Sequence, residues 1–346
     1  SWVPISEELD NMAVVSLCQA SNGDLYAGTG EGLYTSGAFG GTAGSSGKTG
    51  GGVYKSTDNG QTWTALSSTV PPSNSTSSIW SSVGVLAADP VDSNRIYAVT
   101  AGGLRRSDNG GLTWTNPVGA SSRSTDLAMG SDGSIWVNVG AFTYYSPNGN
   151  DNSFSEISKN PAGTNDLPRN GGRQRYAISP QDENVVYCVQ TQNSALRALY
   201  RTEDKVATWE LIQEATSMFD PLCSTSGYCQ GGYDLMLSVS PFDKNHVFLG
   251  GISVWEWKKV SGWRQVSGFG PFNIHVDQHN MIFDPVNPNI AYIVSDGGIT
   301  KSTDAGFTWQ EMNKNYITAQ FYQMGIGQDR TMIGGTQDNG SWYVDG

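Results

Sequence analysis

The chain of 346 residues carries 20 Lys and Arg against 32 Asp and Glu, which makes a formal net charge of −12. This balance disfavours nucleic acid or an anionic membrane surface as a partner, because binding phosphates needs clustered basic side chains. No stretch approaches the roughly 18 apolar residues of a membrane-spanning helix, so we expect no membrane insertion. The 43 glycines, with abundant Ser, Thr and Asn, are typical of short strands joined by tight turns.

Short apolar and aromatic segments recur along the chain between Gly, Pro, Asn and Asp residues, and no window has a sustained helical periodicity. Residues 89–99 and 284–294 repeat one pattern, an Asp-Pro turn followed by a Tyr-containing strand. Four-stranded units repeated around an axis are typical of a β-propeller. The alternative, a β-sandwich, does not explain why one turn recurs at one place in successive units. The predicted units are residues 12–66, 79–117, 124–158, 173–213, 233–266, 274–313 and 320–346, the last of them incomplete.

One turn pattern closes four of these units: a hydroxyl residue, Asp or Asn two places later, and Trp seven places later. The Asp or Asn and the Trp of the four turns are Asp58 and Trp63, Asn109 and Trp114, Asp204 and Trp209, and Asp304 and Trp309. We interpret the turn as structural, because the short polar side chain can accept backbone N–H groups while Gly takes a positive φ and Trp packs between units. The alternative is that these turns bind Ca²⁺ or substrate; a structural Ca²⁺ ion is the only cofactor that we retain.

These turns resemble the Asp-box (BNR) repeats of sialidase-like, sortilin-like and xyloglucanase-like propellers, over essentially the whole chain. Residues 28–32 and 335–342 resemble parts of large secreted Asp-box proteins of the Bacteroidetes type, which are often exported with a C-terminal sorting domain (type IX secretion). The resemblance implies an all-β propeller of about seven four-stranded blades, alone or within a larger ring or tandem. Residues 146–150 keep only a degenerate form of the turn, and residues 254–263 lack it. The sequence begins without Met and ends within a repeat, so we expect it to belong to a longer polypeptide.

In such a propeller the Trp-ended turns lie on one face, and we expect ligands on the other, where the longer loops between units open. These loops are residues 67–82, 159–176, 213–234 and 267–280. The candidate ligand-binding residues in or beside them are Trp80, Arg173, Arg175, Tyr233, His275, Asp277 and His279.

Two of the three histidines lie in the segment His275-Val276-Asp277-Gln278-His279. If the segment is extended, His275, Asp277 and His279 project to one side, because strand side chains alternate. Imidazole and carboxylate together can bind a metal or contact a substrate. We favour hydrogen bonds to neighbouring strands as their role and expect no metal.

An inverting glycoside hydrolase needs two carboxylates separated by room for a water molecule. The resemblance to xyloglucanases implies a Thr-Asp pair after the first Tyr strand, but here Thr29 is followed by Gly30 and then Glu31, and the second acid belongs to a propeller that this chain does not contain. The catalytic candidates are Glu31, Asp234 and Asp296. Residues 169–176 contain three arginines of the kind with which sialidases bind a carboxylate, but the sequence has no Phe-Arg-Ile-Pro segment.

Cys223 and Cys229 bracket a short Ser/Gly-rich loop that a local disulfide can close, which favours an oxidising compartment. We therefore expect a secreted or cell-surface recognition scaffold that binds protein or glycan through the face opposite the Trp-ended turns. The alternative is an extracellular glycoside hydrolase (xyloglucanase-like, inverting) or a lyase acting on polysaccharide.

Overall fold

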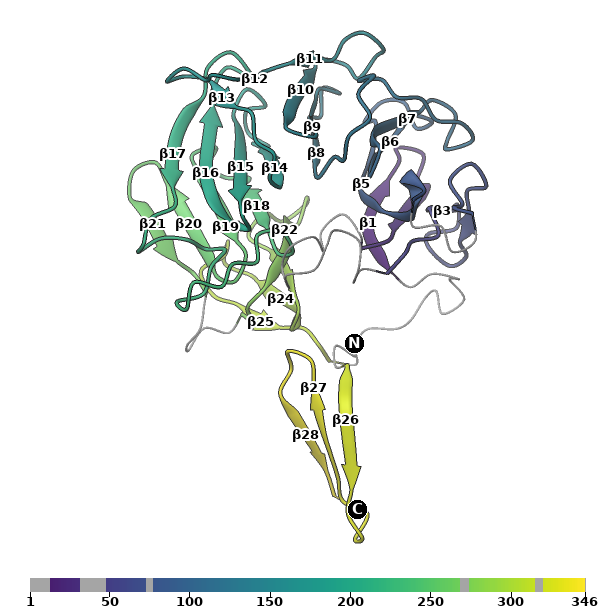
Figure 1. Cartoon of the computed structure of the whole chain (residues 1–346), viewed down its shortest axis with the longest axis vertical. Helices are drawn as coiled ribbons and strands as arrows, with labels where there is room; N and C mark the ends of the chain where they lie inside the picture. The colour runs from purple at the N-terminus through teal and green to yellow at the C-terminus, as the bar shows by residue number, and fades with distance from the viewer. Residues whose placement is uncertain (1–12, 32–47, 73–76, 268–273, 315–319, 346) are drawn as a thin grey trace.

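The computed structural model describes residues 13–31, 48–72, 77–267, 274–314 and 320–345 (Figure 1). Within these ranges the chain forms β-sheets and one short 3-10 turn, η1 (Ile79–Ser81), with no α-helix. The all-β class predicted from the sequence is confirmed. None of the described residues form a helix long and apolar enough to cross a membrane.

The sheets follow one another in chain order, and all but one short pair are antiparallel. The first contains β1 (Val14–Gln19), β2 (Leu25–Thr29), β3 (Val53–Ser56) and β4 (Thr64–Ala65). The second contains β5 (Val83–Ala88), β6 (Ile96–Thr100) and β7 (Gly103–Ser107). The third contains β8 (Leu127–Met129), β9 (Ile135–Val139), β10 (Phe142–Ser146) and β11 (Ser155–Glu156), and is followed by the parallel pair β12 (Ser158–Lys159) and β13 (Leu167–Pro168).

The fourth sheet contains β14 (Gln174–Ile178), β15 (Val186–Gln192), β16 (Ala195–Thr202) and β17 (Glu210–Glu214). The fifth contains β18 (Met236–Val239), β19 (His246–Gly250), β20 (Val254–Lys258) and β21 (Gly262–Gln265). The sixth contains β22 (Gln278–Phe283), β23 (Ala291–Ser295), β24 (Gly298–Ser302) and β25 (Gln310–Glu311). The last contains β26 (Phe321–Ile326), β27 (Met332–Thr336) and β28 (Ser341–Val344).

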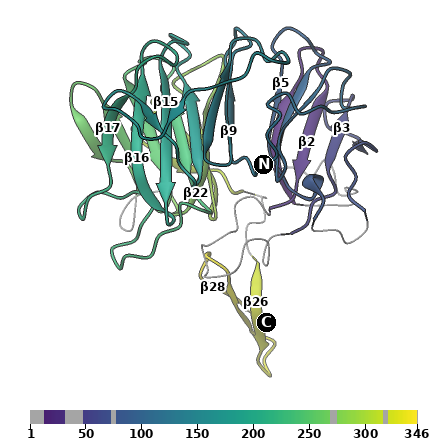
Figure 2. The same cartoon turned by 45° about the horizontal axis from the view of Figure 1, so that its top comes forward.

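The first strand of each sheet packs beside the first strand of the next, from β1 through β5, β8, β14 and β18 to β22. These six sheets stand around a common centre with their first strands innermost (Figures 1 and 2). Consecutive sheets contact one another through these strands, which is the arrangement of propeller blades.

Apolar side chains from adjacent sheets form the core. Tyr187 and Leu199 of the fourth sheet belong to one buried cluster with Leu237 and Leu249 of the fifth. Fully burying a large apolar side chain contributes roughly 1.5–3 kcal/mol. The sheets are therefore stabilised mainly by their neighbours, and not within themselves.

The second sheet has three strands where the repeat predicts four. After Trp114 the chain pairs with β7 only through an isolated bridge between Thr115 and Arg106. Pro117 follows two residues later and has no N–H to donate to β7, so the pairing does not extend into a strand.

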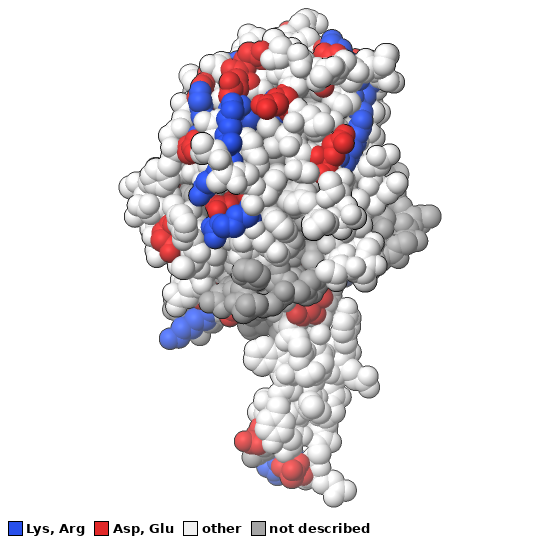
Figure 3. All heavy atoms as spheres, turned by 90° about the vertical axis from the view of Figure 1, so that its left-hand side faces the viewer, with Lys and Arg blue, Asp and Glu red and all other residues white. Residues whose placement is uncertain are grey.

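The last sheet also has three strands, and it projects from the other six (Figure 1). In the view of Figure 3 most of its surface is uncharged, whereas basic and acidic side chains lie next to one another on the side of the six-sheet arrangement. Its exposed large apolar side chains are Phe321, Tyr322, Met324, Ile326, Met332, Ile333, Trp342, Tyr343 and Val344.

The Trp-ended turns share one hydrogen-bond pattern. In the turn of the sixth sheet, Asp304 Oδ1 accepts from the N–H groups of Phe307 (3.1 Å) and Thr308 (2.8 Å), and Asp304 Oδ2 accepts from Thr308 Oγ1 (2.6 Å). Gly306, at φ 92°, donates its N–H to Ser302 Oγ at 2.9 Å. In the first sheet, hydrogen bonds from the equivalent Thr hydroxyl and N–H lower the pKa of Asp58 to about 2.

Val206 changes this pattern in the fourth sheet, where the other turns have Gly. Asp204 still accepts from the N–H and hydroxyl of Thr208, at 2.9 and 2.6 Å. Val206 N–H donates to Asp204 O (2.8 Å), whereas the equivalent glycines donate to the hydroxyl residue that opens the turn. A β-branched residue strongly disfavours a positive φ, so the second half of the turn is rearranged while the Asp contacts remain.

The Trp side chains of the four turns differ in burial. Trp209 and Trp309 are buried, whereas Trp63 and Trp114 are half-buried. Trp63, Trp114 and Trp309 each donate their indole N–H to the Gly carbonyl of their own turn, at 3.0–3.2 Å. Each of these three indoles is thus anchored to its own turn by a backbone hydrogen bond.

We predict that Asp304→Ala lowers the free energy of unfolding by about 1–2 kcal/mol, as loss of a capping side chain does, because the turn N–H groups lose their acceptor. Asp304→Asn is the matched control. Asn109 already occupies the equivalent place and accepts Thr113 N–H at 2.9 Å, so this variant should remain within about 0.5 kcal/mol of the wild type. Denaturant unfolding measures both variants, and equal losses would contradict the acceptor role.

Candidate functional site

Most of the predicted site residues lie at the same end of three consecutive sheets. They are Arg173 and Arg175 at the start of β14, Tyr233 and Asp234 just before β18, His275, Asp277 and His279 around the start of β22, and Asp296 in the turn between β23 and β24. In antiparallel sheets the start of the first strand and the turn after the second strand lie at one end. The turns after the third strand lie at the other. We call the first of these ends the channel face.

Arg175 joins the innermost strands of these sheets. Its Nη1 donates to the carbonyl oxygens of Leu235 (2.5 Å) and His279 (2.7 Å), and its Nη2 donates to Asn280 Oδ1 (2.8 Å). The guanidinium therefore connects β14 to the residues at the starts of β18 and β22. This makes Arg175 a structural residue of the channel.

His279, Asp296 and Tyr233 form a second connection. His279 Nε2 lies 2.6 Å from Asp296 Oδ1, and the Tyr233 hydroxyl donates to the same oxygen at 3.1 Å. The Tyr233 and His279 rings pack edge to face with centroids 5.0 Å apart. Burial and the charge of Asp296 raise the pKa of Tyr233, so the phenol remains protonated. These three side chains therefore bind one another.

His275 uses both of its ring nitrogens on backbone carbonyls. Nδ1 lies 2.9 Å from Val276 O, and Nε2 lies 2.9 Å from Asp338 O. Burial alone would lower the pKa of His275, but the two carbonyl acceptors together with the charges of Asp277 and Asp296 raise the pKa above its ordinary value. Both ring nitrogens of His275 therefore face backbone carbonyl oxygens.

The backbone at Asp277 has a φ of 64°, and β22 begins only at Gln278. The segment is therefore not extended, and the expectation that His275, Asp277 and His279 project to one side as alternating strand residues is wrong. The left-handed residue breaks the alternation that the expectation required.

Asp234 and Asp277 are two interacting carboxyl groups, of which Asp234 is buried and Asp277 is half-buried. Gln230 Nε2 donates to Asp277 Oδ1 at 3.0 Å, and burial followed by the charge of Asp296 raises the pKa of Asp277 to about 6. Asp234 is fully buried, and neither of its carboxyl oxygens has a hydrogen-bond partner. Burial and the charge of Asp277 raise the pKa of Asp234 to about 8, so Asp234 holds a proton at neutral pH.

A cavity of about 510 Å³ opens beside this cluster, between the third and fourth sheets. It is lined by polar residues and glycines, which are Arg123, Thr125, Asn138, Gly140, Gly171, Gly172, Arg173, Thr191, Asn193, Ser194 and Gly232. A second cavity of about 440 Å³ shares Gly171, Gly172 and Asn193 with it and is completed by Asn170, Gln192 and Arg197. No acidic or aromatic residue lines either cavity in the part of the chain that the structure describes.

The three arginines of residues 169–176 do not converge on one ligand position. Arg169 binds the Glu156 carboxylate through Nε (2.7 Å) and Nη2 (3.0 Å), and Arg175 binds the innermost strands. Arg173 alone of the three lines the larger cavity, and its Nη1 donates to Tyr233 O at 2.7 Å. The other cavity arginines, Arg123 and Arg197, come from other strand ends.

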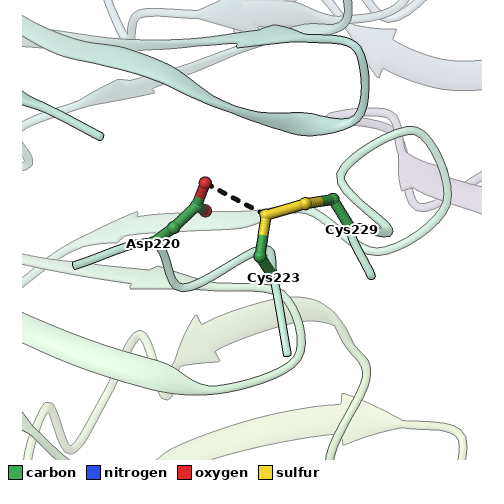
Figure 4. A group of neighbouring side chains, drawn as sticks. All are labelled: Asp220, Cys223 and Cys229. Carbon is green, nitrogen blue, oxygen red and sulfur yellow. Dashed lines mark hydrogen bonds between the residues drawn. A yellow bond between two sulfur atoms is a disulfide. The ribbon is translucent and has the colours of Figure 1, made fainter. Parts of the chain in front are cut away.

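Cys223 and Cys229 are joined by a disulfide in the loop before β18 (Figure 4). Asp220 Oδ2 lies 3.1 Å from Cys223 Sγ. Among the described residues, only these three side chains bring three potential metal ligands within 4.8 Å, and the two sulfurs are bonded to each other, so neither is a thiolate ligand. The loop also forms a wall of the larger cavity, where Gly231 N–H donates to Ser194 O at 2.7 Å.

Glu31 and Trp80 lie on other sheets. Glu31 Oε2 accepts the N–H of Lys48 at 3.0 Å, beside the first sheet. Trp80 packs against Trp114 with ring centroids 5.0 Å apart, between the first and second sheets. Neither residue lines the cavities.

Sequence reasoning missed Arg123, Asn138, Gly171, Gln230 and Asp338. The position of a residue within the repeat unit was a signal that could have located some of them. The turn after the second strand of a unit recurs on the channel face, and it places Asn193, Asp296 and Asp338 there although they are far apart in sequence.

No protein-family model matches the sequence, and no curated protein matches it. Solved structures share the fold. An ancestral GH74 enzyme matches with 15% identity and a TM-score of 0.60, over 97% of this chain and 45% of that one. The extracellular domain of a protein described as a hybrid two-component system from B. thetaiotaomicron matches with 13% identity and a TM-score of 0.58, over 96% and 38%. YCF48 bound to D1 peptide matches with 14% identity and a TM-score of 0.55, over 98% and 95%.

These likenesses show the fold, and the chain is an all-β protein of the β-propeller class. It spans less than half of the length of the GH74 enzyme and of the two-component extracellular domain. At these identities the likeness does not extend to activity or ligand.

We predict that Asp234→Asn flattens the dependence of stability on pH. A carboxyl group whose pKa is raised in the folded protein stabilises it below the unfolded pKa and loses that contribution as pH rises, here from about 4 to about 8. The free energy of unfolding of the variant should exceed that of the wild type by the largest margin near pH 8. Denaturant midpoints between pH 4 and 8 measure this, with Asp329→Asn as control, because the pKa of Asp329 is lowered and contributes only below that window. If the stability of Asp234→Asn depends on pH as steeply as that of the wild type, Asp234 is not the group responsible.

We predict that Arg175→Lys lowers the free energy of unfolding by about 2–4 kcal/mol, because a single ammonium group does not reach the three acceptors that the planar guanidinium joins. Exposed Arg330→Lys is the control and should change stability by less than about 0.5 kcal/mol. Thermal and denaturant unfolding measure both. A neutral Arg175→Lys would show that the innermost strands do not depend on this side chain.

Proposed function

We propose that this chain is an extracellular recognition domain that binds a glycan in the channel-face cavities. The observation that carries the proposal is their lining, which consists of Arg, Thr, Ser, Asn and Gln side chains and glycine backbone. Such groups hydrogen-bond sugar hydroxyls. The volumes of about 510 and 440 Å³ fall in the range of small-ligand sites.

A glycan fits the lining better than an apolar peptide does. Protein interfaces depend on aromatic and aliphatic anchors in desolvated pockets, and neither described cavity is lined by one. The polar wall is also held in place before a ligand arrives. Asn138 Oδ1 accepts from Thr125 N–H (3.0 Å), Thr125 Oγ1 (3.1 Å) and Asp126 N–H (3.0 Å). A rigid polar wall lowers the entropic cost of binding.

An extracellular location is supported by the Cys223–Cys229 disulfide, because such bonds persist in oxidising compartments. The extracellular neighbour from B. thetaiotaomicron has the same fold.

A glycoside hydrolase is the second candidate, and the interacting carboxyl groups of Asp234 and Asp277 favour it. A carboxyl group that stays protonated at neutral pH beside an ionised one is the arrangement of a general acid and a base. A GH74 enzyme also has this fold. Asp234 is fully buried and does not line the cavities, so we rank hydrolysis below binding.

We predict that Gly171→Leu weakens polysaccharide binding at least about tenfold. A Cβ at Gly171 meets no atom within 4 Å, and the residue has no left-handed φ, so the side chain enters the cavity without strain. Gly335→Leu is the matched control, since a Cβ there also meets nothing within 4 Å and the residue lies on β27, outside the cavities. Affinity electrophoresis against neutral and acidic polysaccharides measures binding, and equal affinity of the two variants would place the ligand elsewhere.

The same polysaccharides are assayed for release of reducing ends, with Asp234→Asn beside the wild type. Turnover that Asp234→Asn abolishes, while binding persists, would replace the recognition proposal by the hydrolase. Binding without turnover supports the recognition domain.

A further inference from the structure

We propose that the glycan is a uronate-bearing polysaccharide, whose carboxylate is bound by the arginines of the two channel-face cavities. The inference rests on the proposed function and specifies the ligand class of the same site.

The two cavities form one site with three arginines in its lining. They share Gly171, Gly172 and Asn193, while Arg123 and Arg173 line the larger cavity and Arg197 lines the smaller. The whole chain has only 20 Lys and Arg and a net charge of −12. The described lining of this site has three arginines and no carboxylate, so it is locally basic although the chain as a whole is acidic.

Arg197 is held by neutral oxygens. Its Nη1 donates to Arg169 O at 2.9 Å and to Asn170 Oδ1 at 3.2 Å. Asn170 is 5% exposed, and its Nδ2, which has no hydrogen-bond partner, belongs to a residue that lines the same cavity. A buried donor without an acceptor is costly, so the wall of the smaller cavity holds an unsatisfied amide next to Arg197.

Arg169 provides the contrast. It binds Glu156 through two hydrogen bonds of 2.7 and 3.0 Å, so its charge is matched within the protein, and it lines neither cavity. The arginine that is paired with a carboxylate thus does not line the site. The neighbouring Arg197, bound to a carbonyl and an amide, faces it.

Two acids interact with Arg173, and one of them is neutral at pH 7. Asp126 and Asp234 both interact with Arg173, and both are buried. Burial raises the pKa of Asp126 to about 6 and that of Asp234 to about 8, so Asp234 is neutral at pH 7.

The hydroxyl and amide groups around the arginines favour a sugar acid over other anions. Thr125, Thr191, Ser194 and Asn193 line the site, so both a carboxylate and adjacent hydroxyls find partners. A guanidinium matches the two oxygens of a planar carboxylate with two parallel hydrogen bonds. A sulfate ester carries the same charge with a different geometry, and the experiment separates the two.

The test measures binding of oligogalacturonate, oligomannuronate and oligoguluronate by calorimetry, each beside its methyl ester. The ester keeps the sugar chain and removes the charge. We expect at least one acid to bind at least about tenfold more tightly than its ester. Arg197→Gln should remove most of this preference, whereas the exposed control Arg330→Gln should retain it. Gly171→Leu should weaken binding of acid and ester alike, and dextran sulfate should bind more weakly than the preferred acid.

The outcomes separate the inference from the proposed function. Esters or neutral glycans that bind as tightly as the acids, and that Gly171→Leu excludes, would overturn the uronate assignment and leave the glycan site in place. If dextran sulfate binds more tightly than every uronate, and Gly171→Leu weakens that binding, the assignment of a carboxylate ligand would be overturned. Acid binding that Arg330→Gln weakens as much as Arg197→Gln would reveal a general charge effect and contradict the site. Absence of binding to every acid, ester and neutral glycan would overturn the proposed function itself.

Discussion

The structure depends on the burial of apolar side chains between one sheet and the next. Each sheet has two faces, and the described part of the chain contains no α-helix to cover either of them, so a neighbouring sheet is the available partner. Met236 and Phe248 of the fifth sheet, for example, are buried with Ile293 and Trp309 of the sixth. Stacking sheets face to face in chain order turns them around a common centre, and the propeller follows from that requirement.

The same arrangement brings polar strand ends together at the centre, where they have to satisfy one another. Arg175 supplies donors to two carbonyl groups and an amide of neighbouring sheets, and Asp296 accepts from both Tyr233 and His279. Buried carboxyl groups without such partners keep their protons, as Asp234 does. The electrostatics of the channel face are therefore set by how tightly these ends pack.

Between the third and fourth sheets the packing at the channel face is incomplete, and glycines are part of the reason. At Gly172 a Cβ would lie 2.0 Å from Thr191 O, so only glycine allows the chain before β14 to approach the end of β15. Gly171 beside it leaves open space where another residue would place a side chain. The cavities thus depend on local backbone approach as much as on the polar side chains that line them.

The sequence was informative about the fold because hydrophobic alternation and turn chemistry are local. The all-β class followed from short strands between turn residues. The roles of the site residues were less accessible. His275, Asp277 and His279 lie on the predicted face, but the left-handed backbone at Asp277 removes their alternation, and His275 is engaged by carbonyls of its own segment and of Asp338. Trp80, a candidate ligand platform, is instead a packing partner of Trp114.

By itself, then, the sequence determined the β-strands, the repeated turns and the end of the sheets where polar residues gather, because neighbouring residues decide these features. Only the tertiary structure decided which polar groups satisfy one another and which face a cavity. Arg169, Arg173 and Arg175 are separated by at most six residues, yet one binds a carboxylate, one lines the cavity and one joins three innermost strands. The physical reason is that each guanidinium binds acceptors from distant parts of the chain, whose positions exist only after the sheets have packed.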